Sequence, residues 1–176
     1  MPQNFIEKHW DYSSNAKFYK FRPNYPAKAI NVLINYTGAR KTAGYRVADI
    51  GAGTGNLSVL LLDRGLKVTA VEPNDEMRKI GIERTSGSGK IAWIKANGVN
   101  TTLKSKSADW VTFGSSFNVM DRHLALKETH RVLKNNGFFT CMWNHRDLAD
   151  PVQKIAEDTI VEFVPGSAGA PRAPRT

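Results

Sequence analysis

The sequence has only one cysteine, Cys141, and it has no long apolar run. A single cysteine cannot form an internal disulfide, which is typical of a protein in a reducing compartment. No apolar segment approaches the roughly 20 residues that a membrane-spanning helix requires. The first residues, MPQNFIEKHWDY, lack the basic-then-apolar pattern of a signal peptide. The chain also lacks histidines and cysteines at zinc-ligand spacing. We therefore expect a cytoplasmic protein with no membrane partner and no bound metal.

The charge balance is strongly basic, with 25 Lys and Arg residues against 16 Asp and Glu residues and a net charge of +9. Such a balance is found in proteins that bind nucleic acids, membrane surfaces or acidic substrates. The sequence has no dense basic run with interleaved aromatic residues, and Lys104 and Lys106 alternate with serines in a stretch typical of a loop. A nucleic-acid partner is therefore an alternative and not the main expectation.

Short apolar segments alternate along the chain with segments of helical periodicity. Strands are expected at Arg46–Ile50, Lys67–Val71, Ile91–Lys95, Trp110–Phe113 and Phe138–Trp143. Helices are expected at Ala27–Tyr36, Asn56–Arg64, Asp75–Arg84, Asp121–Leu133 and Pro151–Val164. Asn135, Asn136 and Gly137 are expected to end the fourth of these helices. The alternation predicts a doubly wound α/β fold, with a mainly parallel, Rossmann-like sheet of about five strands and helices on both faces.

The length of 176 residues suits one domain. We expect this domain to span residues 1–164, with the first part, residues 1–40, as an N-terminal helical cap. Residues 165–176 (PGSAGAPRAPRT) are rich in Pro, Gly, Ala and Arg and have no hydrophobic periodicity. This composition predicts a disordered tail.

A glycine-rich segment, Val47–Asn56 (VADIGAGTGN), lies where the first expected strand becomes a helix. Gly51 permits a tight turn, Gly53 leaves the backbone open to a ligand, and Gly55 permits close packing of the helix on the strand. Glycines at such a turn also occur in dinucleotide sites, but that fingerprint is G-x-G-x-x-G, whereas the spacing here is G-x-G-x-G. The preceding Asp49 either holds this turn through backbone N–H groups or contacts the ligand itself.

A second carboxylate, Glu72, ends the second expected strand and precedes Pro-Asn-Asp-Glu-Met, the start of a helix. An ionised carboxylate only accepts hydrogen bonds, so it suits the two hydroxyl groups of an adenosine ribose. Ligands of open α/β sheets bind at the carboxyl ends of the strands, where Glu72 and the glycine-rich segment both lie.

The segment VADIGAGTGNLS followed by VTAVEPNDEM resembles the first two motifs of class I S-adenosylmethionine-dependent methyltransferases. Ile94–Val111 is similar to the family's stretch from the third strand through the adenine site, with Asn97 where the family usually has an acid and Asp109 at the start of the fourth strand. Glu128–Phe139 (ETHRVLKNNGFF) resembles the family's next helix–turn–strand stretch. Tyr19–Pro26 (YKFRPNYP) is similar to an element that folds over the cofactor in the small-molecule branch, of the trans-aconitate methyltransferase type.

This resemblance implies S-adenosylmethionine as the cofactor, S-adenosylhomocysteine as the product and a small molecule as the methyl acceptor. It implies cofactor contacts at Arg22, Tyr25, Asp49, Gly51, Ala52, Gly53, Gly55, Asn56, Glu72, Pro73, Met77, Asn97, Gly98, Val99 and Ser115. Arg22 suits the methionine carboxylate because a guanidinium pairs well with carboxylates. Asn118, after the fourth strand, is the candidate for contact with the acceptor, and no catalytic base is assigned.

The chain departs from the family after the fifth strand, where the family's sheet normally continues with two more strands. We therefore expect an altered or partial member in which cofactor binding is better supported than turnover. The exposed sheet edge favours a homodimer. Two other functions stay open. One is RNA or DNA methylation, which the charge favours, but Gly114–Asn118 (GSSFN) replaces the Asn/Asp-Pro-Pro-aromatic motif of base-amine methyltransferases. The other is cofactor binding without catalysis.

Overall fold

The computed structural model describes residues 12–145 and 147–163. The chain divides after Trp143 into two compact units, Met1–Trp143 and Asn144–Thr176. The expected disordered tail lies outside the described residues. The single domain expected over residues 1–164 stays a prediction.

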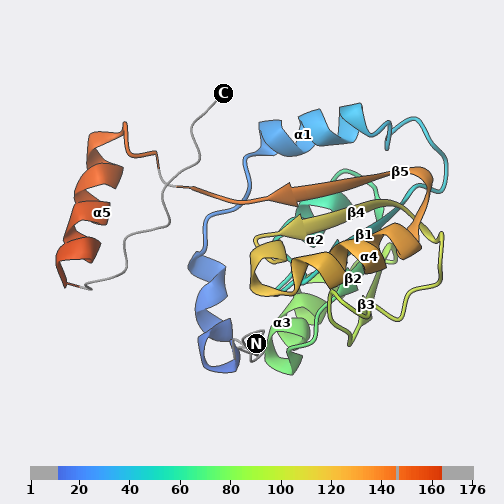
Figure 1. The fold of residues 1–176 in the computed structure, drawn as a ribbon, viewed down its shortest axis with the longest axis horizontal. Helices are drawn as coiled ribbons and strands as arrows, with labels where there is room; N and C mark the ends of the chain where they lie inside the picture. Colours follow the sequence, from blue (N-terminus) through green and yellow to red (C-terminus); the bar gives the residue numbers. More distant parts are fainter. Residues whose placement is uncertain (1–11, 146, 164–176) are drawn as a thin grey trace, which may run out of the picture. The chain divides into compact units, whose positions relative to one another are not determined.

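One parallel sheet forms the centre of the first unit (Figure 1). Its strands are β1 (Arg46–Ile50), β2 (Lys67–Val71), β3 (Ile91–Ile94), β4 (Ala108–Gly114) and β5 (Leu133–Met142), in the order β3-β2-β1-β4-β5. All the neighbouring strands pair in parallel. The chain runs outward from β1 through β2 to β3 and then crosses to β4 on the other side of β1. The direction of winding therefore reverses between β1 and β4, and ligands of doubly wound sheets bind at this reversal.

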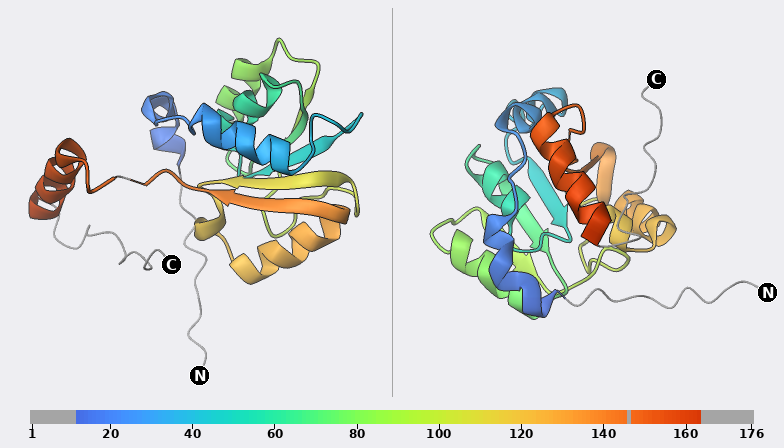
Figure 2. Two further views of the ribbon diagram at one scale, coloured as in Figure 1. Left: turned by 90° about the horizontal axis from the view of Figure 1, so that it is seen from above. Right: turned by 90° about the vertical axis from the view of Figure 1, so that its left-hand side faces the viewer.

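Helices cover both faces of this sheet. The first unit contains the 3-10 helices η1 (Ser13–Phe21) and η2 (Phe117–Val119) and the α-helices α1 (Ala27–Tyr36), α2 (Asn56–Leu62), α3 (Asp75–Thr85) and α4 (Arg122–Val132). Figure 2 shows α1, α2 and α3 over one face and α4 over the other. Short polar side chains fix two helix starts, because Asn74 accepts a hydrogen bond from the Met77 amide and Asp121 accepts one from the Leu124 amide. The predicted doubly wound, Rossmann-like α/β fold is confirmed.

Each face of the sheet has its own apolar core. The first core joins α1 and α2 to the sheet, through Ile30, Ile34, Leu57, Leu61, Val47, Val68 and Trp110. The second joins α4 to the opposite face, through Ile50, Val71, Val111, Phe113 and Val132. Because both faces are covered, residues 47–50 of β1 and 110–113 of β4 are all buried and do not alternate between buried and exposed positions.

The prediction for the start of β5 is wrong. Asn135, Asn136 and Gly137 were expected to separate a helix from a strand that begins at Phe138, whereas α4 ends at Val132 and β5 begins at Leu133. The backbone of Leu133 is already extended, and Leu133 pairs with Ala108 of β4. The ladder then becomes irregular before Trp110 pairs with Phe138. A Cβ on Gly137 would lie 3.0 Å from the Asp109 carbonyl, so the turn residues stay packed on β4 instead of leaving the sheet as a loop.

Cys141 lies in β5 and packs against the second core. Burial raises the pKa of its thiol to about 11. The thiolate, which is the reactive form, is therefore scarce at neutral pH. Cys141 serves as a small apolar side chain in this strand.

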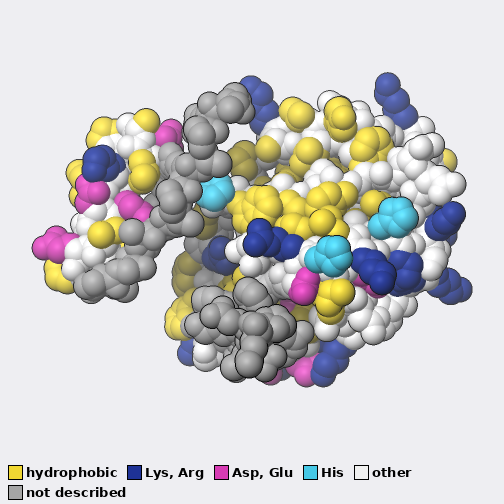
Figure 3. All heavy atoms as spheres, viewed as in Figure 1, with side chains coloured by type: hydrophobic (Ala, Val, Ile, Leu, Met, Phe, Trp, Pro, Cys, Tyr) yellow, Lys and Arg dark blue, Asp and Glu magenta, His cyan; other side chains and the backbone are white. Residues whose placement is uncertain are grey.

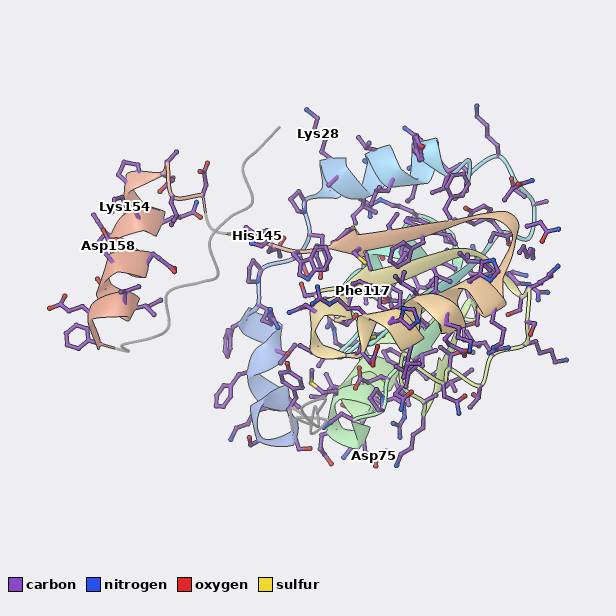
Figure 4. All side chains as sticks on the ribbon, in the orientation of Figure 1. Lys28, Asp75, Phe117, His145, Lys154 and Asp158 are labelled. Atoms are coloured by element: carbon purple, nitrogen blue, oxygen red, sulfur yellow. The ribbon has the colours of Figure 1, made fainter. Side chains whose placement is uncertain are left out.

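The second unit contains α5 (Pro151–Phe163), as the sequence predicts. Asp150 caps its first turn by accepting hydrogen bonds from the amides of Val152 and Gln153. Lys154 and Asp158, labelled in Figure 4, form an ion pair one turn apart. Among the helices that the structure describes, none is long and apolar enough to cross a membrane.

Candidate functional site

The glycine-rich segment forms a tight turn at the carboxyl end of β1. The amides of Gly51 and Ala52 both donate to the Val71 carbonyl at the end of β2, at 2.8 and 3.1 Å. The Gly55 amide donates back to the Ala52 carbonyl at 2.9 Å. Gly51, Gly53 and Gly55 have φ angles of 66°, 58° and 80°, which are strained for residues with a side chain.

The three glycines have different surroundings. A Cβ on Gly51 would lie 2.5 Å from the Ser116 Cβ, and a Cβ on Gly55 would lie 3.3 Å from the Trp93 ring. A Cβ on Gly53 would meet only the methyl group of Met77, at an ordinary contact distance of 3.4 Å. Gly51 and Gly55 are therefore enclosed by protein, whereas Gly53 keeps an open side that a ligand can approach.

Glu72 directly follows β2, beside this open glycine. One of its carboxylate oxygens accepts a hydrogen bond from the Gly53 amide at 2.8 Å, and the other accepts one from the Asn74 amide at 2.9 Å. Burial raises the pKa of Glu72, and these two amide donors oppose the shift. Each oxygen keeps a further lone pair, so the carboxylate can still accept two ligand hydroxyl groups. The neighbouring Pro73 is exposed.

Asp49 is fully buried at the reversal between β1 and β4. Its two carboxylate oxygens accept hydrogen bonds from the hydroxyl groups of Ser58, at 2.6 Å, and Thr112, at 3.1 Å. Burial raises the pKa of Asp49 to about 6, and the hydroxyl donors oppose that shift. Asp49 thus links β1 to α2 and β4 through these hydroxyl groups and the Ser58 amide, whereas the sequence suggested the amides of the glycine turn.

The N-terminal segment reaches the end of β4 through Tyr25. The Tyr25 and Ser115 hydroxyl groups lie 3.0 Å apart in a hydrogen bond. A Cβ on Gly114 would lie 2.9 Å from the Tyr25 oxygen, so the phenol packs directly on the β4 backbone. Burial raises the pKa of Tyr25, which keeps its hydroxyl group protonated. Arg22 instead stacks over the Tyr19 ring, with 5.0 Å to the centroid, and donates to its hydroxyl group at 3.0 Å.

The loop after β3 folds back on the end of β1. The Asn97 side-chain carbonyl accepts hydrogen bonds from the amides of Val99 and Asn100, at 3.1 and 2.8 Å. This brings the buried Gly98 close to Ile50, whose Cγ2 would lie 3.2 Å from a Cβ on the glycine. Asn97 therefore shapes this loop, and its own carbonyl is engaged within it.

The segment after β4 is tied to the same region. The Ser116 hydroxyl group donates to the Ile50 carbonyl at 2.6 Å. Phe117, labelled in Figure 4, packs edge-on against Phe113 at 5.2 Å between ring centroids. The Asn118 side-chain carbonyl accepts from the Trp143 indole at 3.0 Å.

The structure therefore brings together most of the expected cofactor residues. The glycine turn, Glu72, Met77 and Gly98 gather around the carboxyl ends of β1 and β2, and Tyr25 and Ser115 meet at the end of β4. The described contacts of Arg22 and Asn118 lead elsewhere, to Tyr19 and Trp143.

The sequence pattern did not reveal the two hydroxyl partners of Asp49. Ser58 interrupts the apolar helix sequence NLSVLLL, and such a buried polar residue is a signal that could have identified it. Thr112 lies in a β4 sequence of ordinary strand composition and carries no comparable signal.

Comparisons with known proteins agree with this geometry. A family model described as a methyltransferase domain matches residues 48–141, more than half of the chain. An uncharacterized methyltransferase of Mycobacterium tuberculosis is 33% identical over 135 residues, which are 77% of this chain and 52% of the relative. The ubiquinone/menaquinone biosynthesis C-methyltransferase of Rubrivivax gelatinosus is 32% identical over 105 residues, which are 59% of this chain and 41% of the relative. The chain spans about half the length of these curated relatives.

A solved structure shares the fold. A candidate S-adenosyl-L-methionine-dependent methyltransferase of Methanococcus maripaludis superposes with a TM-score of 0.68 at 21% identity, covering 87% of this chain and 71% of that chain. Since the family model covers more than half of the sequence and the fold agrees, the chain belongs to the class I S-adenosylmethionine-dependent methyltransferase family.

Proposed function

We propose that this chain binds S-adenosylmethionine at the carboxyl ends of β1, β2 and β4 and transfers its methyl group to a small-molecule acceptor. One observation supports this most strongly. Gly53 keeps an open side, and the Glu72 carboxylate lies within hydrogen-bonding distance of the Gly53 amide, at 2.8 Å. An open backbone surface beside a buried carboxylate suits an adenosine with two free ribose hydroxyl groups.

The other residues around this point fit the remaining parts of the cofactor. Gly98 and Val99 lie in the loop that folds onto Ile50, and their backbone suits the adenine edge. The Tyr25–Ser115 pair at the end of β4 suits the methionine portion. Both groups of residues are buried or half-buried, so a ligand between them would be shielded from water.

The proposed chemistry places few demands on the protein. The cofactor supplies an activated sulfonium methyl group, so transfer is an in-line displacement. The side chains have to hold the acceptor in line and exclude water. A general base is needed only if the acceptor must lose a proton, and a carboxylate acceptor needs none.

A small-molecule acceptor is favoured by two observations. The Rubrivivax relative is named for ubiquinone and menaquinone biosynthesis, which concerns small molecules. In addition, Phe113, Phe117 and Phe139 pack edge-on around the end of β4 with 5.2 to 5.6 Å between ring centroids. Phe117 of this cluster follows Ser115, which we propose for the methionine portion, by two residues, and an apolar surface there suits a compact organic acceptor.

Titration calorimetry with S-adenosylmethionine and S-adenosylhomocysteine tests the proposal. We expect Glu72→Ala to weaken binding about 10- to 100-fold, because a charged hydrogen-bond acceptor contributes roughly 1.5–3 kcal/mol. Gly53→Val should abolish binding, since its side chain would occupy the open side of the turn. Circular dichroism should show that both variants stay folded.

The exposed Glu83 of α3 offers a matched control, and Glu83→Ala should bind like the wild type. Wild-type affinity in both site variants would refute the site. A wild-type protein that binds a nicotinamide dinucleotide and not S-adenosylmethionine would refute the function.

A further inference from the structure

The glycine turn has a second support in Arg84, near the end of α3. The Arg84 Nη1 donates to the Thr54 carbonyl at 2.7 Å and to the Asn56 side-chain carbonyl at 2.6 Å. The same nitrogen lies 3.3 Å from the Thr54 hydroxyl oxygen. One guanidinium nitrogen thus holds two positions of the turn, 30 and 28 residues away in sequence.

Trp93 of β3 supports the same turn from a neighbouring position. Its ring would lie 3.3 Å from a Cβ on Gly55 and 2.2 Å from a Cβ on Gly81, so it fills the space between the turn and α3. Its indole N–H donates to the Thr85 hydroxyl group at 3.0 Å, and that hydroxyl group donates to the Gly81 carbonyl at 2.8 Å. Trp93 therefore fixes the end of α3, from which Arg84 extends.

Three backbone groups of the turn have partners within the protein. The Gly53 amide is held by Glu72, the Thr54 carbonyl by Arg84 and the Gly55 amide by the Ala52 carbonyl. Thr54 is only 2% exposed, whereas Arg84 is exposed, so the guanidinium covers this part of the turn at the protein surface. Loss of Arg84 would remove the charged donor of the Thr54 carbonyl, and the Thr54–Gly55 peptide could then rotate.

We propose that Arg84 is a positioning residue for the cofactor. Arg84 orients the Thr54–Gly55 peptide before binding, so that the open face of Gly53 is already formed when the cofactor arrives. A site that is formed in advance does not lose affinity to the ordering of its own backbone. This inference rests on the proposed function, because it names a further determinant of the same site.

The experiment compares Arg84→Met with Arg84→Lys and with Lys79→Met. The methionine variant keeps an apolar stem and loses the donors, whereas lysine keeps a charged group with three donors. Lys79→Met removes an exposed cation from the same helix and is the matched control. Two quantities are measured: the dissociation constant for S-adenosylmethionine, and the exchange rate of the Gly55 amide hydrogen in the absence of cofactor.

We expect Arg84→Met to weaken cofactor binding at least tenfold and to speed exchange of the Gly55 amide at least tenfold. Arg84→Lys should recover most of both losses, and Lys79→Met should match the wild type. A merely structural role would lower the unfolding midpoint without a selective change at Gly55. If the methionine variant does not fold, Arg84→Gln, which is shorter and uncharged, is measured in its place.

Wild-type affinity in Arg84→Met, or weakened affinity with unchanged Gly55 exchange, would overturn this inference and leave the proposed function intact. A wild-type protein that binds no S-adenosylmethionine would overturn both. The two failures are therefore distinguishable.

Discussion

Asp49 links neighbouring elements through hydrogen bonds, but its burial makes the charged form of the carboxylate unfavourable. It is fully buried, and only two hydroxyl groups and one backbone amide oppose the effect of burial on its pKa. A folded-state pKa of about 6 lies above the value near 4 of an exposed aspartate. The protonated form is thus favoured by the fold, and the charged form is tolerated at neutral pH at a cost in stability.

This shift predicts a pH-dependent effect of Asp49→Asn. Because the folded pKa is raised, the stabilising contribution of Asp49 is complete below about pH 4 and is lost as the pH rises through about 6. The variant does not titrate, so its stability relative to the wild type should improve between pH 4 and 7, by up to roughly 3 kcal/mol. Urea unfolding at several pH values measures this difference. Asp63→Asn, at an exposed position, is the control, and a pH-independent difference between Asp49→Asn and the wild type would contradict the assignment.

The residues of the site differ in whether the sequence could predict them. The glycines and Glu72 were predictable because they occupy one continuous motif and a strand end, both local in sequence. Thr112 and Arg84 contact that motif only because β4 and α3 fold beside it. Those contacts depend on the packing of distant segments, which no local pattern encodes.

Among the elements, those with sharp local signals were predicted with the same bounds that the structure has. Pro26 precedes α1 and Gly38 follows it, and β1 and β2 are short apolar runs between polar connections. The start of β5 was missed because Leu133 joins the sheet by pairing with Ala108, an interaction across the sheet. Propensity alone assigned Leu133 to the helix, and tertiary pairing overrode that preference.

The loop before β4 depends on Glu128 of α4. Its carboxylate accepts hydrogen bonds from the amide and the hydroxyl group of Thr101, at 2.8 and 2.6 Å, and pairs with Arg131 at 2.7 Å. Arg131 also donates to the Leu103 carbonyl at 2.7 Å. Glu128 and Arg131 thus hold the segment that follows Gly98 and Val99 against α4.

We expect Glu128→Gln to lower the free energy of unfolding by about 2 kcal/mol at pH 7, since a charged hydrogen-bond acceptor is lost from a buried position. Mainly because of Arg131, the pKa of Glu128 is lowered to about 2. The stabilisation is therefore present above about pH 4.5 and disappears as the pH falls toward 2. Thermal unfolding at pH 7 and pH 3 tests this expectation. An equal loss of stability in Glu76→Gln, at an exposed position, would contradict a specific contribution from the buried bonds of Glu128.

For the whole molecule, the sheet order places β5 at an edge of the described sheet. Phe139 and Trp143 are 38% and 40% exposed, and Figure 3 shows apolar side chains gathered along β5 on the face in view. An unpaired edge with exposed apolar side chains can pair with another chain. Self-association through β5 therefore stays a proposal that the sheet supports.

Sedimentation velocity tests this proposal. We expect the mean sedimentation coefficient to rise with protein concentration in the micromolar range. Phe139→Lys should reduce the rise, because edge charges discourage strand pairing. Since Phe139 also packs on Phe113 and Phe117, the exposed Val32→Lys on α1 is the control for a general charge effect. A constant monomeric mass at all concentrations would rule out the homodimer.

The single cysteine is a natural chemical probe of this edge, because its rate of labelling depends on how β5 is packed. Cys141 is the only thiol in the chain, and it lies in the strand that forms the described edge. Its raised pKa makes alkylation slow while β5 stays packed. Because Cys141 is partly buried, a change in its labelling rate with a thiol reagent reports how closely β5 is packed, without any engineered probe. Added cofactor would bind at the carboxyl ends of other strands. It should therefore slow the labelling of Cys141 only as far as it stabilises the whole sheet.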